Sequence, residues 1–574
     1  MKSTKFFQRS DLTATLWAFR REFVIVGLLS FLANLLLLTP TIYMLQVFDR
    51  VMVSQSELTL LAVSLITVVL FVIMALSEWL RSRVLVGAGV RFDEVLSTRV
   101  FNASFEAYLS QSGANPGRAF NDLLQIRQFL TGNGIYALFD APWAPIYIAV
   151  TFMLHPWLGV LAIVFALVQL ALAWFGHHQT VEPSETAART GAEVNAYLQG
   201  KLRNAEALES MGMIGNLQTR WKERHENWLE QGSAAQGLTH RITALSKFIR
   251  YSQQSLALGA GALLVIDGQL SAGAMIAANV LMGRALAPID QLVGTWRSFI
   301  TTRAAFVRLE ALLVEFPERD QALTRVAPSG SVALKKVFAT ATGRKELILK
   351  DINLTVPAGT VTVVLGPSGS GKSTLARVIV GIWPHVAGEV LLDDLPISSW
   401  NRIDLGPHLG YLPQDIELFE GTIAENIARF RELESEKVIE AARCAGLHEM
   451  ILRFPKGYDT PIGEAGSLLS GGQRQRIGLA RAIYGDPALI VLDEPNANLD
   501  DAGEAALTRT VHDLKQKGKT VFLITHRPGA IAAADRLLIL RDGAIQAEGP
   551  RDDVIAALRP RAEPGTPGLT PQPA

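Results

Sequence analysis

The stretch Val361-Thr-Val-Val-Leu-Gly-Pro-Ser-Gly-Ser-Gly-Lys-Ser-Thr374 decides the fold of the second half of this chain. Its first five residues are apolar or β-branched and predict a buried parallel strand. The turn that follows fits G-x-x-x-x-G-K-[ST], a loop whose backbone N–H groups surround the phosphates of a nucleotide. Glycine lets the backbone approach the phosphates, and the N-terminus of the next helix adds partial positive charge, so an α/β nucleotide-binding domain is expected. The residues expected to bind ATP here are Gly366, Pro367, Ser368, Gly369, Ser370, Gly371, Lys372, Ser373 and Thr374.

Two carboxylates follow a second apolar run farther along the chain. Leu489–Leu492 predicts a strand that ends at Asp493 and Glu494. We expect Lys372 to reach the β- and γ-phosphates, and Ser373 and Asp493 to hold Mg²⁺. Glu494 is then positioned to polarise the attacking water as the catalytic base.

A second glycine turn lies between these two motifs. Leu469-Ser470-Gly471-Gly472-Gln473 opens a predicted helix. One nucleotide needs only one phosphate cradle at a helix start. The second turn therefore predicts a site that serves a nucleotide bound to another copy, which makes the protein a homodimer.

Composition points to a membrane portion. Hydrophobic residues make up 49% of the 574 residues and charged residues only 19%, with a mean hydropathy of +0.24. Lys+Arg and Asp+Glu both total 54, so charge gives no argument for nucleic acid. The single cysteine, Cys444, excludes an internal disulfide framework. No cleavage site follows the first apolar stretch, so no signal peptide is expected.

Before residue 317 the sequence contains six apolar stretches of roughly the ~20 residues that span a bilayer. The third, fifth and sixth are interrupted by proline, glutamine or arginine. The predicted spans are Phe23–Val47, Leu58–Leu80, Ile135–Leu154, Leu158–Phe175, Ser246–Ile266 and Leu270–Val293. The expected fold is a membrane bundle of six transmembrane helices fused to a P-loop ATPase domain.

The basic residues predict the orientation. Lys2, Lys5, Arg9, Arg20 and Arg21 precede the first span, and the segments after the second and fourth spans are long and basic. Because cytoplasmic loops carry the excess of Lys and Arg, we expect a multi-pass protein of the cytoplasmic (inner) membrane. Its N-terminus and its ATPase domain then both lie in the cytoplasm, where ATP is.

The domain boundaries follow from these patterns. We expect a cytoplasmic segment over 1–21, a transmembrane domain over 22–316, a nucleotide-binding domain over 332–556 and a disordered Pro- and Gly-rich tail over 557–574. Within the membrane half, about 81–134 and 177–247 read as helical extensions of the spans. The turns at Asn115–Arg118 and Asn204–Met213 could contact the ATPase domain, although ordinary solvated hairpins would have the same pattern.

The motifs of the second half closely resemble those of the ABC transporter ATPases. The resemblance implies that Gln414 senses Mg²⁺, and that Ser470, Gly471, Gly472 and Gln473 close over a nucleotide held by the opposite subunit. It also implies that Asp500 crosses the dimer seam and that His526 holds the γ-phosphate and orders the water. Gly463–Gly466 resembles an element that relays nucleotide state in exporters. One departure is Ala341, which stands where the family has an aromatic residue against the adenine, so the adenine contact has another source or is weaker.

A narrower resemblance extends over nearly the whole chain. Ile42–Arg50, Phe139–Ile146, Tyr411–Thr422 and Leu492–Asp500 are similar to segments of type I secretion permease/ATPases of the alkaline-protease-exporter type. Such proteins work with a periplasmic membrane-fusion adaptor and an outer-membrane channel, and they export unfolded proteins with C-terminal signals. Relatives that trim leader peptides use a cysteine peptidase, and Cys444 cannot provide one because it lies inside the ATPase half.

Two other functions fit the same ATP-driven machinery. One is a lipid or multidrug flippase, and the other is an ATPase that assembles an envelope complex without moving a substrate. Polar residues in the spans favour a hydrated path: Arg284 is expected in the lumen, and Arg250 either there or at the interface. Asp140 has the pattern of a helix cap, and Pro142, Pro145 and Pro288 are expected to kink their helices.

Overall fold

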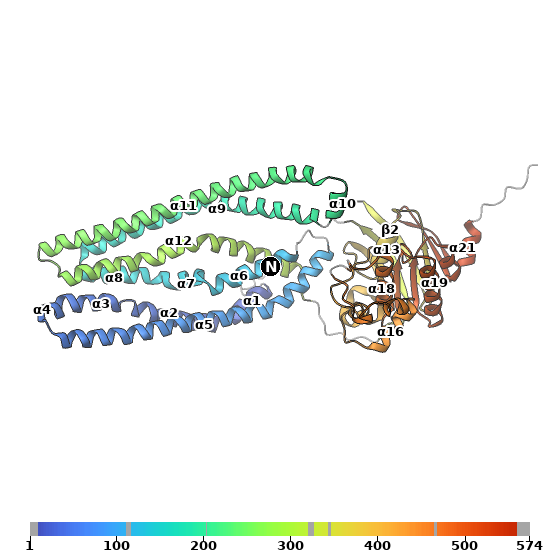
Figure 1. Cartoon of the computed structure of the whole chain (residues 1–574), viewed down its shortest axis with the longest axis horizontal. Helices are drawn as coiled ribbons and strands as arrows, with labels where there is room; N and C mark the ends of the chain where they lie inside the picture. The colour runs from blue at the N-terminus through green and yellow to red at the C-terminus, as the bar shows by residue number, and fades with distance from the viewer. Residues whose placement is uncertain are drawn as a thin grey trace, which may run out of the picture. The chain divides into compact units, whose positions relative to one another are not determined.

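The computed structural model describes residues 10–110, 116–202, 204–318, 327–341, 346–463, 466 and 468–558. The chain divides into two compact units, one formed by Met1–Phe105 with Asn115–Pro317 and the other by Glu106–Ala114 with Glu318–Ala574. The first, here called the helical unit, is a bundle of long helices, and the second, the sheet unit, has strands flanked by helices (Figure 1). Several sequence predictions lie outside the described residues: those on Lys2, Lys5, Arg9, Asn115, Glu464, Ala465 and 559–574.

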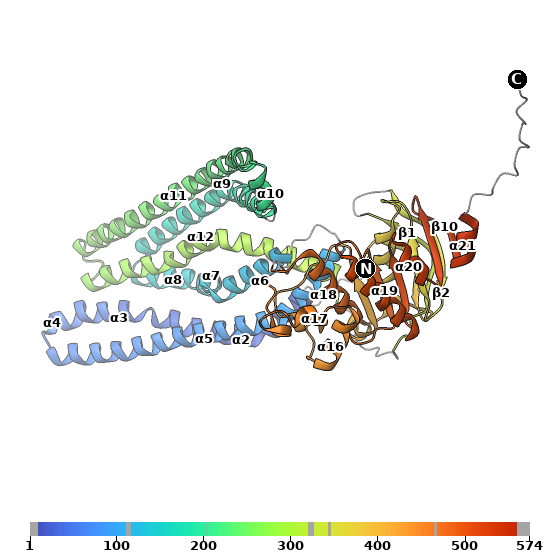
Figure 2. The same ribbon diagram turned by 45° about the vertical axis from the view of Figure 1, so that its right-hand side comes forward.

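The helical unit is built from antiparallel hairpins of apolar helices, seen side by side in Figures 1 and 2. Its elements are α1 (Asp11–Ala18), α2 (Arg20–Leu36), α3 (Thr39–Gln46), η2 (Val47–Val51), α4 (Met52–Ser54), α5 (Glu57–Leu109), α6 (Pro116–Thr131), α7 (Asn133–Asp140), η3 (Ala141–Trp143), α8 (Ala144–Leu154), α9 (Pro156–Leu202), α10 (Ala205–Ser210), α11 (Ile214–Ile266) and α12 (Ala272–Glu315). The two long extensions predicted after the second and fourth spans are helical, as expected, over most of their described residues; they are interrupted by turns at Ser110, Gly132, Asn204 and Met211–Met213.

Five helical segments are long and apolar enough to cross a membrane in the part of the chain that the structure describes. They are Arg20–Ser54, Glu57–Leu109, Asn133–Leu154, Pro156–Leu202 and Ala272–Trp296. The remaining predicted span, Ser246–Ile266, forms the end of the continuous helix α11 but is not among the five. The reason is its polarity, since Arg250, Gln253 and Gln254 fall inside it.

The prolines act differently in the two spans where kinks were expected. The third span is divided into α7, the short 3₁₀ turn η3 and α8, with Pro142 in η3 and Pro145 in the first turn of α8. Proline is tolerated at a first turn because the N–H that it lacks has no partner there. By contrast, α12 continues as one helix through Pro288. Arg284 lies on the same helix with an exposed side chain.

The sheet unit contains two sheets. Its strands are β1 (Val332–Thr340), β2 (Leu347–Val356), β3 (Val361–Leu365), β4 (Val386–Leu392), β5 (Leu395–Pro396), β6 (Leu409–Leu412), β7 (Leu489–Asp493), β8 (Thr520–Ile524), β9 (Arg536–Arg541) and β10 (Ala544–Pro550). The antiparallel sheet has the order β2-β1-β4-β5, and the six-stranded sheet has the order β10-β9-β3-β8-β7-β6, parallel except for β10.

The helices of the sheet unit divide into main helices and short connecting turns. The main ones are α13 (Lys372–Ile379), α16 (Ser435–Cys444), α18 (Gly471–Ile483), α19 (Asp501–Gln516) and α21 (Arg551–Leu558). The shorter elements are η4 (Ile397–Ser399), α14 (Arg402–Leu405), η5 (Gly406–His408), α15 (Ile423–Ile427), α17 (His448–Ile451), η6 (Gly457–Asp459) and α20 (Pro528–Ala533).

The parallel sheet is buried on both faces, as its apolar strands predict. Successive residues of a strand point to opposite faces, and two hydrophobic clusters share the side chains accordingly. One face packs against α16, α18 and α19 through Val363, Ile490, Leu523 and their neighbours. The other packs against α13 and the antiparallel sheet through Val364, Val491, Phe522 and their neighbours. Residues that follow these strands are thereby held at a rigid sheet edge.

Candidate nucleotide site

Four neighbouring parallel strands bring the predicted site residues to one edge of the sheet. The strand β3 pairs with β8, β8 with β7, and β7 with β6. The carboxyl ends of parallel strands meet at the same edge, where ligands of open α/β sheets bind. At this edge β3 leads into Gly366, β8 is followed by His526, β7 ends at Asp493 before Glu494, and β6 is followed shortly by Gln414.

The phosphate loop, residues 366–371, has a backbone that requires glycine. Gly366 has φ +155°, and a Cβ there would lie 2.1 Å from the carbonyl oxygen of Leu540. Gly371 is the N-cap of α13 in the left-handed region, with φ +98°. The ammonium Nζ of Lys372 donates to the carbonyl oxygens of Gly366 at 2.8 Å and Pro367 at 2.9 Å. The loop therefore curls around a buried ammonium group at the start of a helix.

Asp493 is a buried carboxylate with an unused oxygen. Its residue is 1% exposed, and its Oδ1 has no hydrogen-bond partner among the described residues. Burial raises the pKa of Asp493, against a hydrogen bond with Ser373 that lowers it. Buried carboxylates are normally paired or bound to metal, and oxygen atoms of carboxylate and hydroxyl groups suit Mg²⁺. The donor set of Ser373 and Asp493 therefore fits the expected cation.

Glu494 is held by backbone and amide groups on three sides. Its φ is +49°, and its N–H donates to the carbonyl oxygen of Ile524 at 3.0 Å. The side chain of Gln414 donates from Nε2 to Glu494 Oε2 at 3.3 Å. Gln475, which is 1% exposed, donates from Nε2 to the Glu494 carbonyl at 3.2 Å. Sequence reasoning missed Gln475, whose only signal was its place in the helix that the second glycine turn opens.

The second glycine turn caps α18 and forms a separate group. Ser470 and Gln473 make a capping box, in which Ser470 N donates to Gln473 Oε1 at 2.8 Å and Gln473 N donates to Ser470 Oγ at 3.3 Å. A Cβ on Gly472 would lie 2.8 Å from the carbonyl oxygen of Asn498, whereas one on Gly471 would lie 3.6 Å from the Asn498 side chain. Because Gly472 has no side chain, the start of α18 can pack closely against the backbone of Asn498, which precedes α19.

A hollow of about 510 Å³ joins this turn to Asp500. Asp500 is the N-cap of α19, accepting from Gly503 N at 2.8 Å, and it is paired with Arg476. The hydrogen bond from Gly503 and the charge of Arg476 lower the pKa of Asp500. Its carboxylate therefore stays ionised beside Ser470 and Gly472 in the wall of the hollow.

The remaining predicted contacts lie near the ends of strands. His526 is exposed directly after β8, where the preceding Thr525 donates from Oγ1 to Asn496 Oδ1 at 2.9 Å. Ala341 directly follows β1, and the neighbouring Thr340 carbonyl accepts from Trp383 Nε1 at 3.0 Å. An aromatic ring thus stands beside the end of β1, contributed by the segment after α13.

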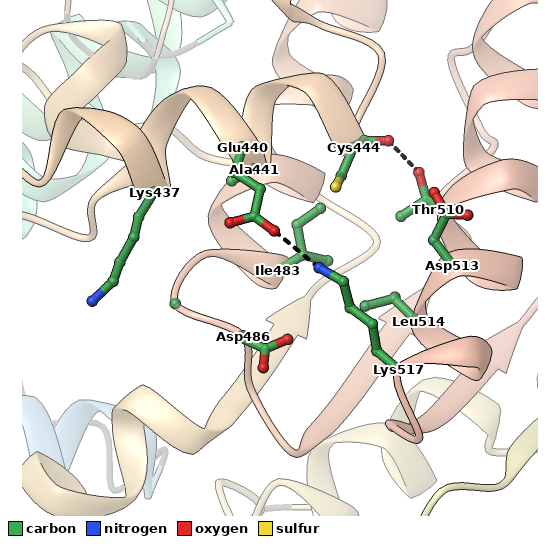
Figure 3. A pocket seen from close by; sticks show the side chains of 11 residues that line it. Lys437, Glu440, Ala441, Cys444, Ile483, Asp486, Thr510, Asp513, Leu514 and Lys517 are labelled. Atoms are coloured by element: carbon green, nitrogen blue, oxygen red, sulfur yellow. Dashed lines mark hydrogen bonds and ion pairs between the residues drawn. The ribbon is translucent and has the colours of Figure 1, made fainter.

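A second, smaller pocket of about 120 Å³ is lined by none of the predicted site residues. It lies between α16, the turn after α18, and α19, and Figure 3 shows Glu440 reaching Lys517 across it. The two charged atoms are 2.9 Å apart, and Thr510 donates to the Cys444 carbonyl at 2.5 Å. Burial raises the pKa of the Cys444 thiol, which makes it a poor nucleophile.

Comparison with known proteins agrees with this geometry. Residues 349–497 match the ABC transporter family, and 23–288 match the ABC transporter transmembrane region. The chain is 42% identical over 557 residues to the type I secretion system ATP-binding protein PrsD of Rhizobium meliloti (strain 1021), covering 96% of each protein. It is 30% identical over 560 residues to the toxin RTX-I translocation ATP-binding protein of Actinobacillus pleuropneumoniae, covering 94% of this chain and 77% of that protein.

A solved structure has the same architecture. A bacterial Atm1-family ABC exporter with ATP bound superposes with a TM-score of 0.81 at 23% identity, covering 94% of this chain and 96% of that one. The membrane bundle fused to a P-loop ATPase domain, expected from the sequence, is thus confirmed. With its transmembrane and ATPase regions both matched and a relative 42% identical over almost its whole length, the chain belongs to the type I secretion family of ABC transporters, in which ATP hydrolysis drives protein export.

Proposed function

We propose that this chain is the inner-membrane ABC component of a type I secretion system and exports unfolded proteins that carry C-terminal signals. The observation that supports this most is the 42% identity to a type I secretion ATP-binding protein over 96% of both chains. The RTX-I translocation protein points to the same class of cargo. The alternative of a lipid or drug flippase has no comparable observation in its favour.

The residues at the sheet edge suit ATP hydrolysis. Lys372 and the N–H groups of the phosphate loop bind and orient the β- and γ-phosphates. Glu494 accepts the proton of the attacking water, and Gln414 holds the Glu494 carboxylate in place through the 3.3 Å hydrogen bond. His526, next along the same edge, binds the γ-phosphate and orders the water.

Ser373 and Asp493 are the residues that would hold Mg²⁺ with the nucleotide. When bound, the cation neutralises charge on the phosphates. The buried Asp493 Oδ1, which has no partner among the described residues, supports this assignment. Gln414, shortly after β6, hydrogen-bonds to Glu494, the neighbour of Asp493. This position fits the proposed role of Gln414 as a residue that senses bound Mg²⁺.

The working unit in this proposal is a homodimer with two shared sites. Ser470, Gly471, Gly472 and Gln473 of one copy bind the nucleotide held by the phosphate loop of the other, and Asp500 lies at the seam. Within one chain, Ser470 and Asp500 border a hollow of their own rather than the phosphate loop. Such a hollow is suited to receive a group from a second copy.

The partners follow from the topology. The turns between spans are short, such as Asp267–Gln269 between α11 and α12, and cannot form a periplasmic conduit. A periplasmic membrane-fusion adaptor and an outer-membrane channel would complete it. In this arrangement the N-terminus and the ATPase domain are cytoplasmic, and the turn around α10 transmits nucleotide state to the membrane helices.

The experiment that tests this function is ATP turnover of the purified homodimer in lipid vesicles. It is titrated with C-terminal segments of candidate secreted proteins, with scrambled segments as controls, and separately with lipids and drugs. A saturable response to one segment, lost on scrambling, is the expected result. A response to a lipid or drug, with indifference to every segment, would replace secretion by the flippase.

A further inference from the structure

The segments that carry Glu494 and His526 leave the sheet directly after two neighbouring strands. Asp493, the last residue of β7, is paired with Ile524, the last residue of β8. One residue on, Glu494 N donates to the carbonyl oxygen of Ile524 at 3.0 Å. Beyond this bond both segments are outside the strands, so the spacing between Glu494 and His526 depends on side-chain contacts.

A buried hydroxyl joins the two segments where the strands end. Thr525 is 2% exposed, and its Oγ1 donates to Asn496 Oδ1 at 2.9 Å. With the bond between Glu494 and Ile524, this contact closes a hydrogen-bonded ring formed by 494–496 and 524–525. Pro495, which belongs to the same ring, is also buried. The ring therefore has little freedom to change its size.

The same hydroxyl fixes the backbone of His526. Arg527 N donates to Thr525 Oγ1 at 3.2 Å, so His526 is the middle residue of a turn that the threonine side chain closes. A threonine hydroxyl donates one proton and accepts through its oxygen. Here it donates to Asn496 and accepts from Arg527. One buried atom thus holds the turn at His526 and ties this turn to the segment after β7.

Glu494, on the opposite side of the ring, has a backbone that needs support. Its φ of +49° lies in the left-handed region, which disfavours residues other than glycine. The Glu494 carbonyl accepts from Ala497 N at 3.2 Å and from Gln475 Nε2 at 3.2 Å. Such a conformation persists where several contacts determine it together, and it is found mostly at functional sites. The bond between Asn496 and Thr525 adds one more of these contacts.

We infer that Asn496 and Thr525 are positioning residues, which set where the Glu494 carboxylate lies relative to the His526 imidazole. The Thr525 hydroxyl holds the turn at His526, and Asn496 Oδ1 holds that hydroxyl in register with the segment after β7. The inference rests on the proposed ATPase function, because this spacing matters only if Glu494 and His526 act on one phosphate.

Three substitutions separate the hydrogen bond from the shape of the side chains. Thr525→Val keeps the shape and removes the hydroxyl, Thr525→Ser keeps the hydroxyl, and Asn496→Ala removes the acceptor. ATP turnover is measured on the full-length homodimer in lipid vesicles. Thr525→Val and Asn496→Ala are each expected to lower it by about 10–100-fold, because a small misplacement of reacting groups costs about that much. Thr525→Ser is expected to keep most of it.

A matched control separates this effect from a loss of folding. Thr510 of α19 is 1% exposed and donates from Oγ1 to the Ala506 carbonyl at 2.9 Å. Thr510→Val also removes a buried hydroxyl, and it is expected to keep turnover. An equal loss for Thr510→Val and Thr525→Val, or a Thr525→Ser variant as inactive as Thr525→Val, would overturn the inference. If Thr525→Val does not fold, the half-buried Asn496 provides the test, and full turnover of Asn496→Ala is the contradicting result.

A second measurement tests the link to His526 without hydrolysis. In a Glu494→Gln background, affinities for ATP and ADP are measured by displacement of a fluorescent nucleotide. Only ATP carries the γ-phosphate, so Thr525→Val is expected to weaken ATP binding by about 2–10-fold, as the loss of one hydrogen bond would, and to leave ADP binding unchanged. With His526→Ala already present, Thr525→Val should have no further effect, because it acts through the imidazole. A further loss there would contradict the inference.

The His526→Ala variant also separates the inference from the proposed function. If His526→Ala leaves both turnover and ATP affinity unchanged, the proposed role of His526 is wrong, and the inference fails with it. If His526→Ala lowers both while Thr525→Val and Asn496→Ala lower neither, the proposed function stands and the inference alone is wrong.

Discussion

At the scale of single residues, the two adjacent carboxylates at the end of β7 have different surroundings. Asp493 is buried, with its pKa raised by that burial, whereas Glu494 meets Gln414 at 3.3 Å and has a left-handed backbone. A buried carboxylate with a free oxygen suits a cation. The Glu494 carboxylate, which Gln414 holds by a hydrogen bond, suits the proposed role of a general base that takes a proton from the attacking water.

Glu494→Gln is expected to lower ATP turnover by about 10²–10⁴-fold, because general-base catalysis contributes about that much. Binding of ATP and ATP-dependent association of the ATPase halves should remain, because the phosphate loop is unchanged. Turnover and association are measured on the same preparation. Glu440→Gln is the control, since its partly exposed ion pair with Lys517 contributes little. Substantial turnover by Glu494→Gln would remove this residue from the role of base.

Asp493→Asn is expected to raise the melting temperature at neutral pH while abolishing Mg²⁺-dependent turnover. Burial raises the pKa of Asp493 in the folded state, so the folded protein binds the proton more tightly than the unfolded chain. The charged carboxylate therefore destabilises the fold above that raised pKa, and the penalty disappears as the pH falls below the unfolded value. Melting is followed against pH in EDTA without nucleotide, with the exposed Asp542→Asn as control. A lower melting temperature for Asp493→Asn would contradict the assignment.

At the scale of elements, β6, the strand that precedes Gln414, touches α18, the helix that the second glycine turn opens. A Cβ on Gly410 of β6 would lie 2.2 Å from the carbonyl oxygen of Ala482 in α18. Both atoms belong to backbones in regular structure, so neither can move cheaply. The absence of a side chain at Gly410 thus fixes how β6 and α18 pack.

Gly410→Ala is expected to destabilise the ATPase domain by about 1–3 kcal/mol, the usual cost of overpacking. The matched control is Gly406→Ala, where the nearest atom to a new Cβ is a flexible Arg431 nitrogen at 3.5 Å. The measurement is the melting temperature of each variant, and that of Gly410→Ala is expected to be the lower of the two. Equal melting temperatures would mean that β6 and α18 separate without cost.

Asp140→Asn and Asp290→Asn compare two ion pairs of the helical unit, Arg81–Asp140 at 3.2 Å and Arg250–Asp290 at 3.9 Å. Removing one charge of a tight buried pair costs about 3–5 kcal/mol, whereas a half-exposed pair contributes about 0–1 kcal/mol. Asp140→Asn is therefore expected to lower the melting temperature of the detergent-solubilised protein far more than Asp290→Asn does. Arg81→Gln should match Asp140→Asn, because both leave one buried charge unpaired. A larger loss for Asp290→Asn would mean that the Arg250–Asp290 pair contributes more to stability than the more buried Arg81–Asp140 pair.

At the scale of the whole molecule, the shared nucleotide site predicts complementation between two inactive chains. Lys372→Ala removes the phosphate contact, and Gly472→Asp blocks the second glycine turn. A dimer of one chain of each kind keeps one intact site, formed by the loop of one and the turn of the other. Equal mixing should restore about a quarter of wild-type turnover, since half of the dimers are mixed and each has one site.

Mixed dimers of wild type with Lys372→Ala provide the reference, because they also carry one intact site. If that reference hydrolyses ATP and the complementing mixture does not, the two motifs do not meet between copies. Each homodimeric variant should stay inactive by itself. The two chains carry different affinity tags and are co-expressed, or are mixed under conditions in which folded subunits exchange. Dimers that carry both tags are then purified and counted before ATP turnover is measured.

The sequence alone determined the order of the two halves, the six apolar stretches and the phosphate loop. These features are local: a glycine loop surrounds phosphates with its own backbone, and a span needs only length and apolar composition. Residues that follow parallel strands were also predictable as neighbours, because strand ends share an edge. The roles given to Glu494, His526 and Asp500 remain predictions for the experiments above.

Only the tertiary structure decided which distant side chains meet. Gln475 reaches the Glu494 carbonyl from α18, and Asp140 meets Asn34 and Arg81 from two other helices, although its local pattern suggested a cap. The fifth predicted span falls short of the apolar composition because Arg250, Gln253 and Gln254 lie inside it, and the structure buries Gln253 against neighbouring helices. Sequence periodicity reports the face on which a residue lies. The partner on that face depends on packing between segments far apart in the chain, and only the folded structure shows which partner it is.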